Sequence, residues 1–209
     1  MFAPFIPSDA VILDIGAHAG QFSKLFASMA PRGRVWAFEP SAYARSVMGP
    51  ALRFNAIGNV TLIPMGLSDR PGELTLHTPI KRKQSLGFGI AHLGANTGRT
   101  FDQKVVLTTL DAFAGERGLA RLDFIKADVE GWELRALTGG EATLRRFSPA
   151  LYLEVDAACL ARAGDTPEGL FAWLADLGYR GFTTPDGRAA PDYGGPGDYL
   201  FLTKGKALT

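Results

Sequence analysis

Apolar residues in the first third of the chain form one continuous run followed by one helical stripe. Residues 11–16 read VILDIG, in which four apolar side chains flank a single carboxylate before a glycine. Continuous apolar runs of this length are typical of strands that are buried on both faces of a parallel sheet. From Phe22 onward, apolar residues recur every three or four positions, which predicts a helix that ends at Pro31 and Gly33. The chain is therefore expected to begin with a strand, a glycine-containing turn and a helix.

The same alternation of apolar runs and helical stripes continues along the chain. Strands are predicted at residues 34–40, 60–68, 122–131 and 150–156, and helices at 41–55, 111–118, 132–147 and 167–177, with breaks at Gly49-Pro50 and Gly139-Gly140. Because strands alternate with helices, we predict right-handed crossovers and a doubly wound, Rossmann-like α/β fold with a mostly parallel sheet. Residues 179–184 and 199–204 flank a turn-rich segment and predict an antiparallel hairpin at the C-terminal end.

One segment, residues 70–108, breaks the alternation. Residues 72–79 alternate like a half-exposed strand, and residues 104–110 are interpreted as the partner strand. The polar, glycine-rich stretch between them includes the basic run 81–83, which is interpreted as a solvated loop face. A loop of this length is usually functional or mobile. We therefore predict a single domain, residues 1–209, with a hairpin-and-loop insertion at about 70–108.

Composition excludes several classes of protein. The net charge of +1 gives no electrostatic basis for binding nucleic acid, and no apolar run approaches the ~20 residues of a membrane span. Cys159 is the single cysteine and cannot form an internal disulfide, so a reducing, cytoplasmic location is expected. The N-terminal ten residues carry no Lys or Arg and are not expected to be a signal peptide. The sequence leaves the oligomeric state open.

The turn after the first strand has the spacing Gly16-x-x-x-Gly20, which suits a ligand held close to the backbone. A phosphate-binding loop would need Gly-Lys-Ser/Thr, but Gly20 is followed by Gln21 and Phe22. The spacing also departs from the G-x-G-x-x-G turn of dinucleotide-binding proteins. The remaining interpretation is the D-x-G-x-x-x-G turn of an S-adenosylmethionine site, with tight packing of the glycines alone as the alternative.

Acidic and polar residues at the ends of the next strands support a nucleoside ligand. Glu39 ends the second strand, where a carboxylate can accept hydrogen bonds from both ribose hydroxyls. Ser68 and Asp69 end the third strand, where an adenine edge would lie, and Asp14 is expected to attract the ammonium group of the methionine moiety. The residues expected to contact S-adenosylmethionine are Asp14, Gly16, Ala17, His18, Gly20, Phe22, Glu39, Pro40, Ser68, Asp69 and Asp128.

Charged residues also gather at the end of the predicted fourth strand. Lys126, Asp128 and Glu130 share one parity, so they are expected at the exposed end of this strand or paired with one another. These three residues are the candidates for removing a proton from an acceptor, without a firm choice among them, and His18 is a further catalytic candidate beside the cofactor. Two alternatives remain open: a structural ion-pair network, and a divalent cation held by Asp128 and Glu154. We predict no metal, because Lys126 already supplies positive charge there.

Several segments together resemble the FkbM family of methyltransferases. They are residues 11–23, 35–41, 66–76, 108–113, 123–140 and 149–155, of which IKADVEGWE at 125–133 is the most distinctive. The resemblance covers roughly residues 9–157 and implies the class I methyltransferase fold, S-adenosylmethionine as cofactor and O-methylation of a sugar or other small-molecule hydroxyl. His18 departs from the family, which often has Asn at this place.

Two other functions remain possible from the sequence. A nicotinamide-dependent oxidoreductase would need the tighter glycine turn and an acid for hydride transfer, neither of which is evident. A non-catalytic or partner-dependent nucleotide-binding protein is the second alternative, because only about ten residues precede the first strand and the site is expected to be open.

Overall fold

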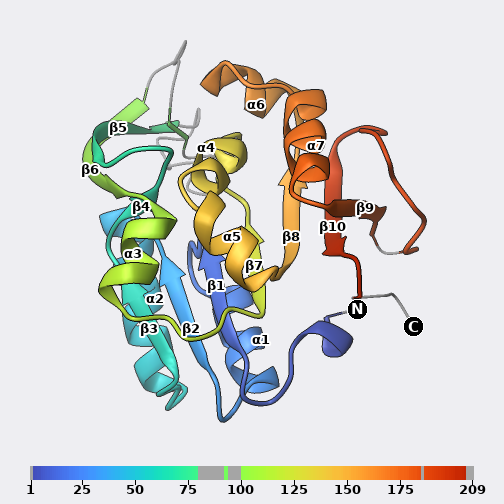
Figure 1. Cartoon of the computed structure of the whole chain (residues 1–209). Helices are drawn as coiled ribbons and strands as arrows, with labels where there is room; N and C mark the ends of the chain where they lie inside the picture. The colour runs from blue at the N-terminus through green and yellow to red at the C-terminus, as the bar shows by residue number, and fades with distance from the viewer. Residues whose placement is uncertain (1, 80–91, 94–99, 185, 206–209) are drawn as a thin grey trace.

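The computed structural model describes residues 2–79, 92–93, 100–184 and 186–205 (Figure 1). A seven-stranded sheet with the order β3-β2-β1-β7-β8-β10-β9 forms its centre. The central strands are β1 (Val11–Ile15), β2 (Arg34–Phe38), β3 (Val60–Ile63), β7 (Phe124–Ala127) and β8 (Ala150–Val155), and all pairs among them are parallel. The predicted doubly wound, mostly parallel α/β sheet is therefore confirmed.

Helices cover both faces of this sheet (Figure 1). They are α1 (Gln21–Met29), α2 (Ala42–Phe54), α3 (Leu110–Glu116), α4 (Glu133–Thr138), α5 (Glu141–Phe147), α6 (Ala157–Ala163) and α7 (Pro167–Asp176), with the short 3-10 helix η1 (Ala3–Phe5) before β1. One face packs Leu13 and Ile125 against α3, α5 and α7, while the other packs Ile12 and Phe124 against Phe26 of α1. Because neighbouring residues of each central strand point to opposite faces, the continuous apolar runs are buried on both sides.

The predicted third strand, residues 60–68, is divided between two sheets. Residues 60–63 form β3 of the central sheet, whereas β4 (Gly66–Leu67) pairs with β6 (Thr100–Thr108) in a separate three-stranded sheet. Pro64 interrupts the strand, since proline has no backbone N–H to donate to a ladder. The expectation of one strand was wrong, and the division carries the chain away from the central sheet and into the insertion.

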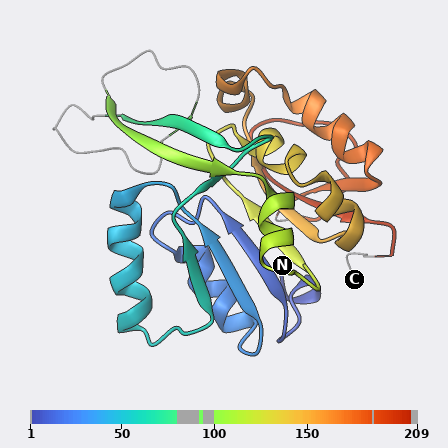
Figure 2. The ribbon, with the colours of Figure 1, turned by 60° about the vertical axis from the view of Figure 1, so that its left-hand side comes forward.

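The insertion contains a long antiparallel pair, which we call the arm: β5 (Gly72–Pro79) and β6. The two strands pair in register from Gly72 opposite Leu107 to Pro79 opposite Thr100. Figure 2 shows the arm reaching past the start of α2 at the carboxyl edge of the central sheet. The basic run 81–83 lies outside the described residues.

Two helices differ from the sequence predictions. The expected break at Gly49-Pro50 is absent, because α2 continues to Phe54 with Pro50 on its exposed side. Helix α6 was not predicted. Asp156 begins it, with its carboxylate accepting a hydrogen bond from the backbone N–H of Cys159 at 2.9 Å.

The C-terminal strands are antiparallel, as predicted. Strand β10 (Gly197–Thr203) lies between β8 and β9 (Tyr179–Thr183) and runs antiparallel to both. Helix α7 begins at the expected Thr166-Pro167 pair, with the Thr166 hydroxyl accepting from the backbone N–H of Gly169. None of the helices in the described part of the chain combines the length and the apolar character that crossing a bilayer requires.

Candidate active site

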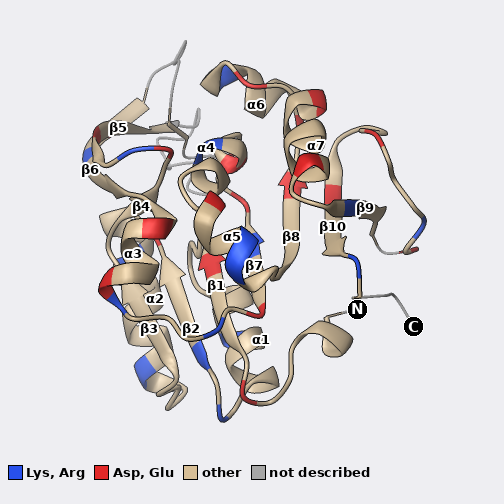
Figure 3. Cartoon of the chain, viewed as in Figure 1, with Lys and Arg blue, Asp and Glu red and all other residues tan. Residues whose placement is uncertain are grey.

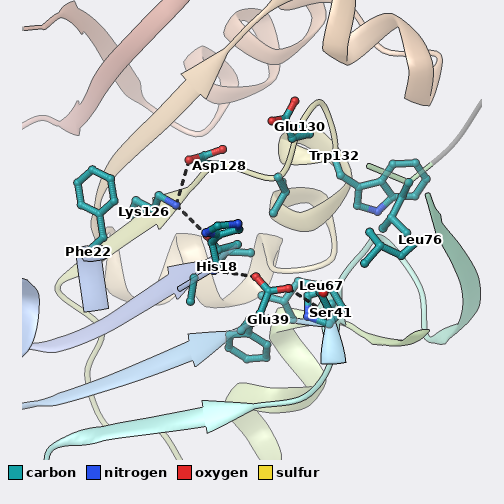
Figure 4. A pocket seen from close by; sticks show the side chains of 18 of the residues that line it. His18, Phe22, Glu39, Ser41, Leu67, Leu76, Lys126, Asp128, Glu130 and Trp132 are labelled. Carbon is teal, nitrogen blue, oxygen red and sulfur yellow. Dashed lines mark hydrogen bonds and ion pairs between the residues drawn. The ribbon is translucent and has the colours of Figure 1, made fainter. Parts of the chain in front are cut away.

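A cavity of about 370 Å³ opens at the carboxyl edge of the central sheet, beside the arm (Figure 4). This is where open α/β sheets bind ligands, and the volume lies in the usual range for small-molecule sites. The lining comes from the β1–α1 turn, the start of α1, the β2–α2 connection, β4, the arm segment and the β7–α4 turn: residues 15–18, 21, 22, 38–41, 66, 67, 76, 93, 126, 128–130 and 132.

The β1–α1 turn uses its backbone donors within the protein. The N–H groups of Gly16 and Ala17 both donate to the carbonyl oxygen of Phe38 at 3.0 Å, and the N–H of His18 donates to Oε2 of Glu39 at 2.7 Å. The expectation that this turn holds a ligand through its backbone N–H groups is therefore not met by these three residues. Their bonds instead hold the β1–α1 turn against the end of β2.

Both glycines of the turn are required by chain geometry. Gly16 has φ +76°, and a Cβ there would lie 1.9 Å from the carbonyl oxygen of Asp128. Gly20 has φ +83° and precedes α1, and a Cβ there would meet Met48. Tight packing, the alternative to a ligand-binding turn, therefore accounts for the spacing of Gly16 and Gly20. Gly16 also lines the cavity, whereas Gly20 is not among the described lining residues.

Glu39 provides a fixed carboxylate in the cavity wall. Its Oε2 accepts from His18 N–H, and its Oε1 accepts from the backbone N–H of Ser41 at 2.7 Å, so both oxygens are oriented while each keeps a free lone pair. Burial raises the pKa of Glu39 above its ordinary value, against these two N–H bonds, which favour the carboxylate. The second strand therefore ends in a rigid acceptor suited to a pair of hydroxyl groups.

Lys126 joins the ends of β1 and β7. Its Nζ lies 3.0 Å from the carbonyl oxygen of Gly16, 3.3 Å from Oδ2 of Asp128 and 3.6 Å from Oδ1 of Asp14. The ammonium group also lies 5.2 Å from the centre of the Phe22 ring, and the side chain is 3% exposed. Three acceptors surround an ammonium group with three protons, so this residue is a structural cation rather than a free base.

Asp14 supports this lysine from below the cavity. The side chain is fully buried, accepts a hydrogen bond from the Ser23 hydroxyl and does not belong to the described lining. Burial raises the pKa of Asp14, while the charge of Lys126 lowers it. The structure thus does not place Asp14 in contact with a cavity ligand, in contrast to the expectation of a direct partner for the methionine ammonium.

The predicted fourth strand was too long, because β7 ends at Ala127, but the expected pairing is confirmed by the ion pair between Lys126 and Asp128. Asp128 and Glu130 belong to the turn that follows, and Glu130 has the positive φ of +54°. Glu133 at the start of α4 holds this turn: its Oε1 accepts from the N–H groups of Val129 at 2.9 Å and Gly131 at 3.2 Å. Asp128 and Glu130 nonetheless both line the cavity, because the turn carries them around its edge (Figure 4).

The carboxylates at this edge influence one another. Burial raises the pKa of Glu130, and the nearby charge of Asp128 raises it further. Burial and a hydrogen bond with Asp128 raise the pKa of Glu154, at the end of β8, to about 8. Among the described residues, no group of three or more His, Cys, Asp or Glu side chains is arranged to hold a metal ion.

Cys159 contacts the same edge from α6. Its thiol donates to Oε2 of Glu130 at 3.6 Å, and Arg162 lies 3.8 Å from the same oxygen. The Cys159 side chain is therefore partly exposed and hydrogen-bonded.

The remaining predicted residues divide between the cavity and the layer behind it. His18 lines the cavity with φ +49°, and its buried Nε2 has no hydrogen-bond partner among the described residues. Ser68 is 2% exposed and lies behind the lining, accepting from the indole N–H of Trp132 at 3.2 Å and donating to Asp69. Ser68 and Asp69 therefore support Trp132, and the cavity contact falls to Trp132 itself.

Sequence reasoning missed part of the apolar lining. Leu67, Leu76, Leu93 and Trp132 form an apolar wall of the cavity, and Figure 4 shows Leu67 of this wall beside Glu39 and Ser41. Nothing in the local pattern identifies Leu76 or Leu93, because their place depends on how the arm folds back. An apolar wall in the same cavity as a fixed carboxylate fits a nucleoside, whose base is flat and whose ribose carries two hydroxyls.

Comparison with known proteins agrees with this geometry. Residues 14–180 match the family model described as the methyltransferase FkbM domain. The 2-O-methyltransferase NoeI of Sinorhizobium fredii is 29% identical over 152 residues, which cover 66% of this chain. The chain spans only 60% of the length of NoeI.

Solved structures show the same fold. The crystal structure of methyltransferase FkbM from Methylobacillus flagellatus KT has a TM-score of 0.59 at 17% identity, over 94% of this chain and 44% of that one. A putative methyltransferase from Streptococcus mutans, solved in complex with SAH, has a TM-score of 0.54 at 10% identity, over 96% of this chain and 91% of the other.

Proposed function

The chain belongs to the FkbM methyltransferase family, and from this premise we propose that it transfers the methyl group of S-adenosylmethionine to a hydroxyl of a sugar or small natural product. The name of the relative NoeI, a 2-O-methyltransferase, supports oxygen as the methylated atom. The SAH in the complex of the Streptococcus mutans neighbour supports the choice of cofactor.

The observation that carries the proposal is the fixed carboxylate of Glu39 in the same cavity as the apolar wall. Two backbone N–H groups hold the carboxylate at the end of β2, so accepting the ribose hydroxyls requires no rearrangement of the side chain. Pro40 and Leu67 line the adjoining surface, where the adenine would pack. The methionine portion would then extend along the β1–α1 turn toward Asp128.

S-adenosylmethionine supplies a methyl group that is already activated by the sulfonium. The protein therefore has to orient the acceptor oxygen and take its proton. We propose that a carboxylate oxygen of Asp128 accepts this proton. The Asp128 side chain lines the cavity and is 40% exposed, and Lys126 contacts it from the buried side. The 3.3 Å contact with Lys126 holds Asp128 in place.

Glu130 and Glu154 are the neighbouring carboxyl groups at this edge. A raised pKa makes each of them a stronger base than an ordinary carboxylate once it is ionised. Burial and the hydrogen bond with Asp128 raise the pKa of Glu154 to about 8, which favours its protonated form as the donor in that bond.

The acidic edge also supports an acceptor without negative charge. Glu154 of β8 pairs in register with Asp198 of β10, and Asp128 follows β7, the neighbour of β8. Figure 3 shows acidic residues on both β8 and β10. A phosphate or carboxylate on the acceptor would be repelled by this row of side chains, whereas an uncharged hydroxyl would not.

The test is a transfer assay with S-adenosylmethionine and a panel of neutral glycosides, with phosphorylated glycosides as matched acceptors. We expect S-adenosylhomocysteine to be released together with a product heavier by one methylene, methylated on oxygen and formed only from uncharged acceptors. Methylation confined to nitrogen, or efficient methylation of the phosphorylated members alone, would contradict the proposal.

A further inference from the structure

The side chain of Gln103 in the arm is hydrogen-bonded to the segment 40–42, which follows Glu39. Gln103 lies in β6 directly opposite Leu76 of β5, so the two side chains share one face of the arm, and Leu76 lines the cavity. Oε1 of Gln103 accepts from the backbone N–H of Ala42 at 3.0 Å, and Nε2 donates to the carbonyl oxygen of Pro40 at 3.1 Å. Gln103 thus bridges two places that are 61 and 63 residues away in sequence.

These two bonds enclose Ser41, whose backbone N–H donates to Oε1 of Glu39. Arg45 supports the same segment through its Nη1, which lies 2.9 Å from the carbonyl oxygen of Glu39 and 2.6 Å from that of Pro40. A change in the position of Gln103 would therefore move the segment 40–42, and with it one of the two N–H groups that orient the Glu39 carboxylate.

From these contacts we propose that Gln103 is a positioning residue that couples the arm to the ribose-binding end of the cavity. The proposal rests on the proposed function, because it takes Glu39 as the acceptor of the ribose hydroxyls. When the cofactor fixes Glu39 and Ser41, Gln103 holds the arm with Leu76 over the cavity. By reciprocity, an arm in this position favours cofactor binding.

Among the described residues of the arm, the side chain of Gln103 makes both of the hydrogen bonds that join the arm to the segment 40–42. The hydrophobic cluster beneath the arm contains Leu76, Leu93, Val105, Leu107 and Trp132. Apolar contacts tolerate small shifts, whereas two hydrogen bonds from one amide fix both the distance and the register between β6 and the start of α2.

The first experiment measures the affinity for S-adenosylhomocysteine by titration calorimetry in wild type, Gln103→Ala and the control Lys104→Ala. Lys104 is the exposed neighbour of Gln103 and points to the opposite face of the arm. Loss of two uncharged hydrogen bonds should raise the Kd of Gln103→Ala about 5- to 20-fold, with Lys104→Ala unchanged. An affinity of Gln103→Ala within 2-fold of wild type would overturn the inference.

Hydrogen exchange on the same proteins separates coupling from general destabilisation. In wild type, S-adenosylhomocysteine should increase the protection of residues 72–79 and 100–108, and Gln103→Ala should lose this increase while keeping the protection of β1 and β2. If ligand protects the arm equally in both proteins, Gln103 is not the connection.

Gln103→Glu changes the hydrogen bonds of this side chain while its size stays nearly the same. The new carboxylate still accepts from Ala42, but when ionised it faces the carbonyl oxygen of Pro40 with no proton to donate. The affinity deficit relative to wild type should therefore be large at pH 8 and shrink toward pH 4, where an ordinary glutamate with a pKa of about 4.3 is mostly protonated and the donor is restored. A pH-independent ratio would overturn the inference. If wild type itself bound no S-adenosylhomocysteine, the proposed function would fail first, and the coupling would fail with it.

Discussion

The ammonium nitrogen of Lys126 lies 3.3 Å from Oδ2 of Asp128, and the two side chains differ sharply in exposure. Lys126 is 3% exposed and Asp128 is 40% exposed, so the pair extends from the protein interior to the cavity. The buried member holds its charge among internal acceptors, and the exposed member presents the remaining oxygen to the ligand. This arrangement gives the two residues different roles that their spacing in sequence does not distinguish.

We expect Asp128→Asn to lower turnover by about 10²- to 10⁴-fold while preserving the fold and the affinity for S-adenosylhomocysteine. Asparagine keeps the size of the side chain but has no carboxylate to accept the proton. The measurements are turnover, melting temperature and calorimetric affinity. Asp192→Asn is the matched control, because Asp192 is exposed in the loop before β10.

The same variant separates two other roles of Asp128. A structural ion pair would show itself as a lower melting temperature with near-normal turnover of the folded protein. A metal ligand would make wild-type turnover sensitive to EDTA and restorable by Mg²⁺. Full turnover in a stable Asp128→Asn protein would remove Asp128 as the base and move the assignment to Glu130.

Lys126→Met should destabilise the protein by about 3–5 kcal/mol, because it leaves the buried carboxylate of Asp14 without its cation. Adding Asp14→Asn should recover a large part of that loss, since the unpaired charge is then removed. The measurement is urea denaturation of the two single variants and the double variant, analysed as a mutant cycle. Strictly additive effects of the two substitutions would mean that the buried pair is not coupled.

The raised pKa of Glu133 predicts that the stability of the protein depends on pH. Burial raises its pKa to about 7, although the N–H bonds from Val129 and Gly131 lower it. A carboxyl with a raised pKa stabilises the fold while protonated, so its contribution is complete below the ordinary pKa of 4.5 and is lost as pH rises through 7. Between pH 5 and pH 8, wild type should lose roughly 2–3 kcal/mol relative to Glu133→Gln.

The Glu133→Gln comparison uses denaturant melts of both proteins at each pH. Glutamine retains an oxygen that accepts the two backbone N–H groups, so the turn after β7 should remain intact. The other carboxylates with raised pKa values titrate in both proteins and cancel in the difference. Parallel stability curves from pH 5 to pH 8 would show that Glu133 is already ionised at the lower pH.

The central sheet was predicted well from the sequence, because strands that are buried on both faces consist of continuous apolar residues. The runs 11–16 and 150–156 contain few polar residues, and both are strands of the parallel sheet. Prediction failed where local rules compete. Pro64 ended β3 inside an apolar run. Pro50 did not end α2, because it lies on the exposed side of that helix.

The site was predicted in its location but only partly in its contacts. Glu39 and Asp128 line the cavity because both follow parallel strands that end at the same edge. Asp14 was misplaced because its carboxylate points into the layer beneath the cavity, and sequence does not show the direction of a side chain at a strand end. Gln103 was missed because its partners lie more than 60 residues away in sequence.

The central claim is that the cavity binds S-adenosylmethionine through Glu39. Titration calorimetry with S-adenosylhomocysteine tests it most directly, on wild type, Glu39→Gln and the exposed control Glu116→Gln. We predict one site per chain in wild type, affinity about 10- to 100-fold weaker in Glu39→Gln because a charged hydrogen-bond acceptor is lost, and no change in Glu116→Gln. Equal affinity in wild type and Glu39→Gln would contradict the assignment of the ribose site, and binding of NAD in place of S-adenosylhomocysteine would contradict the account as a whole.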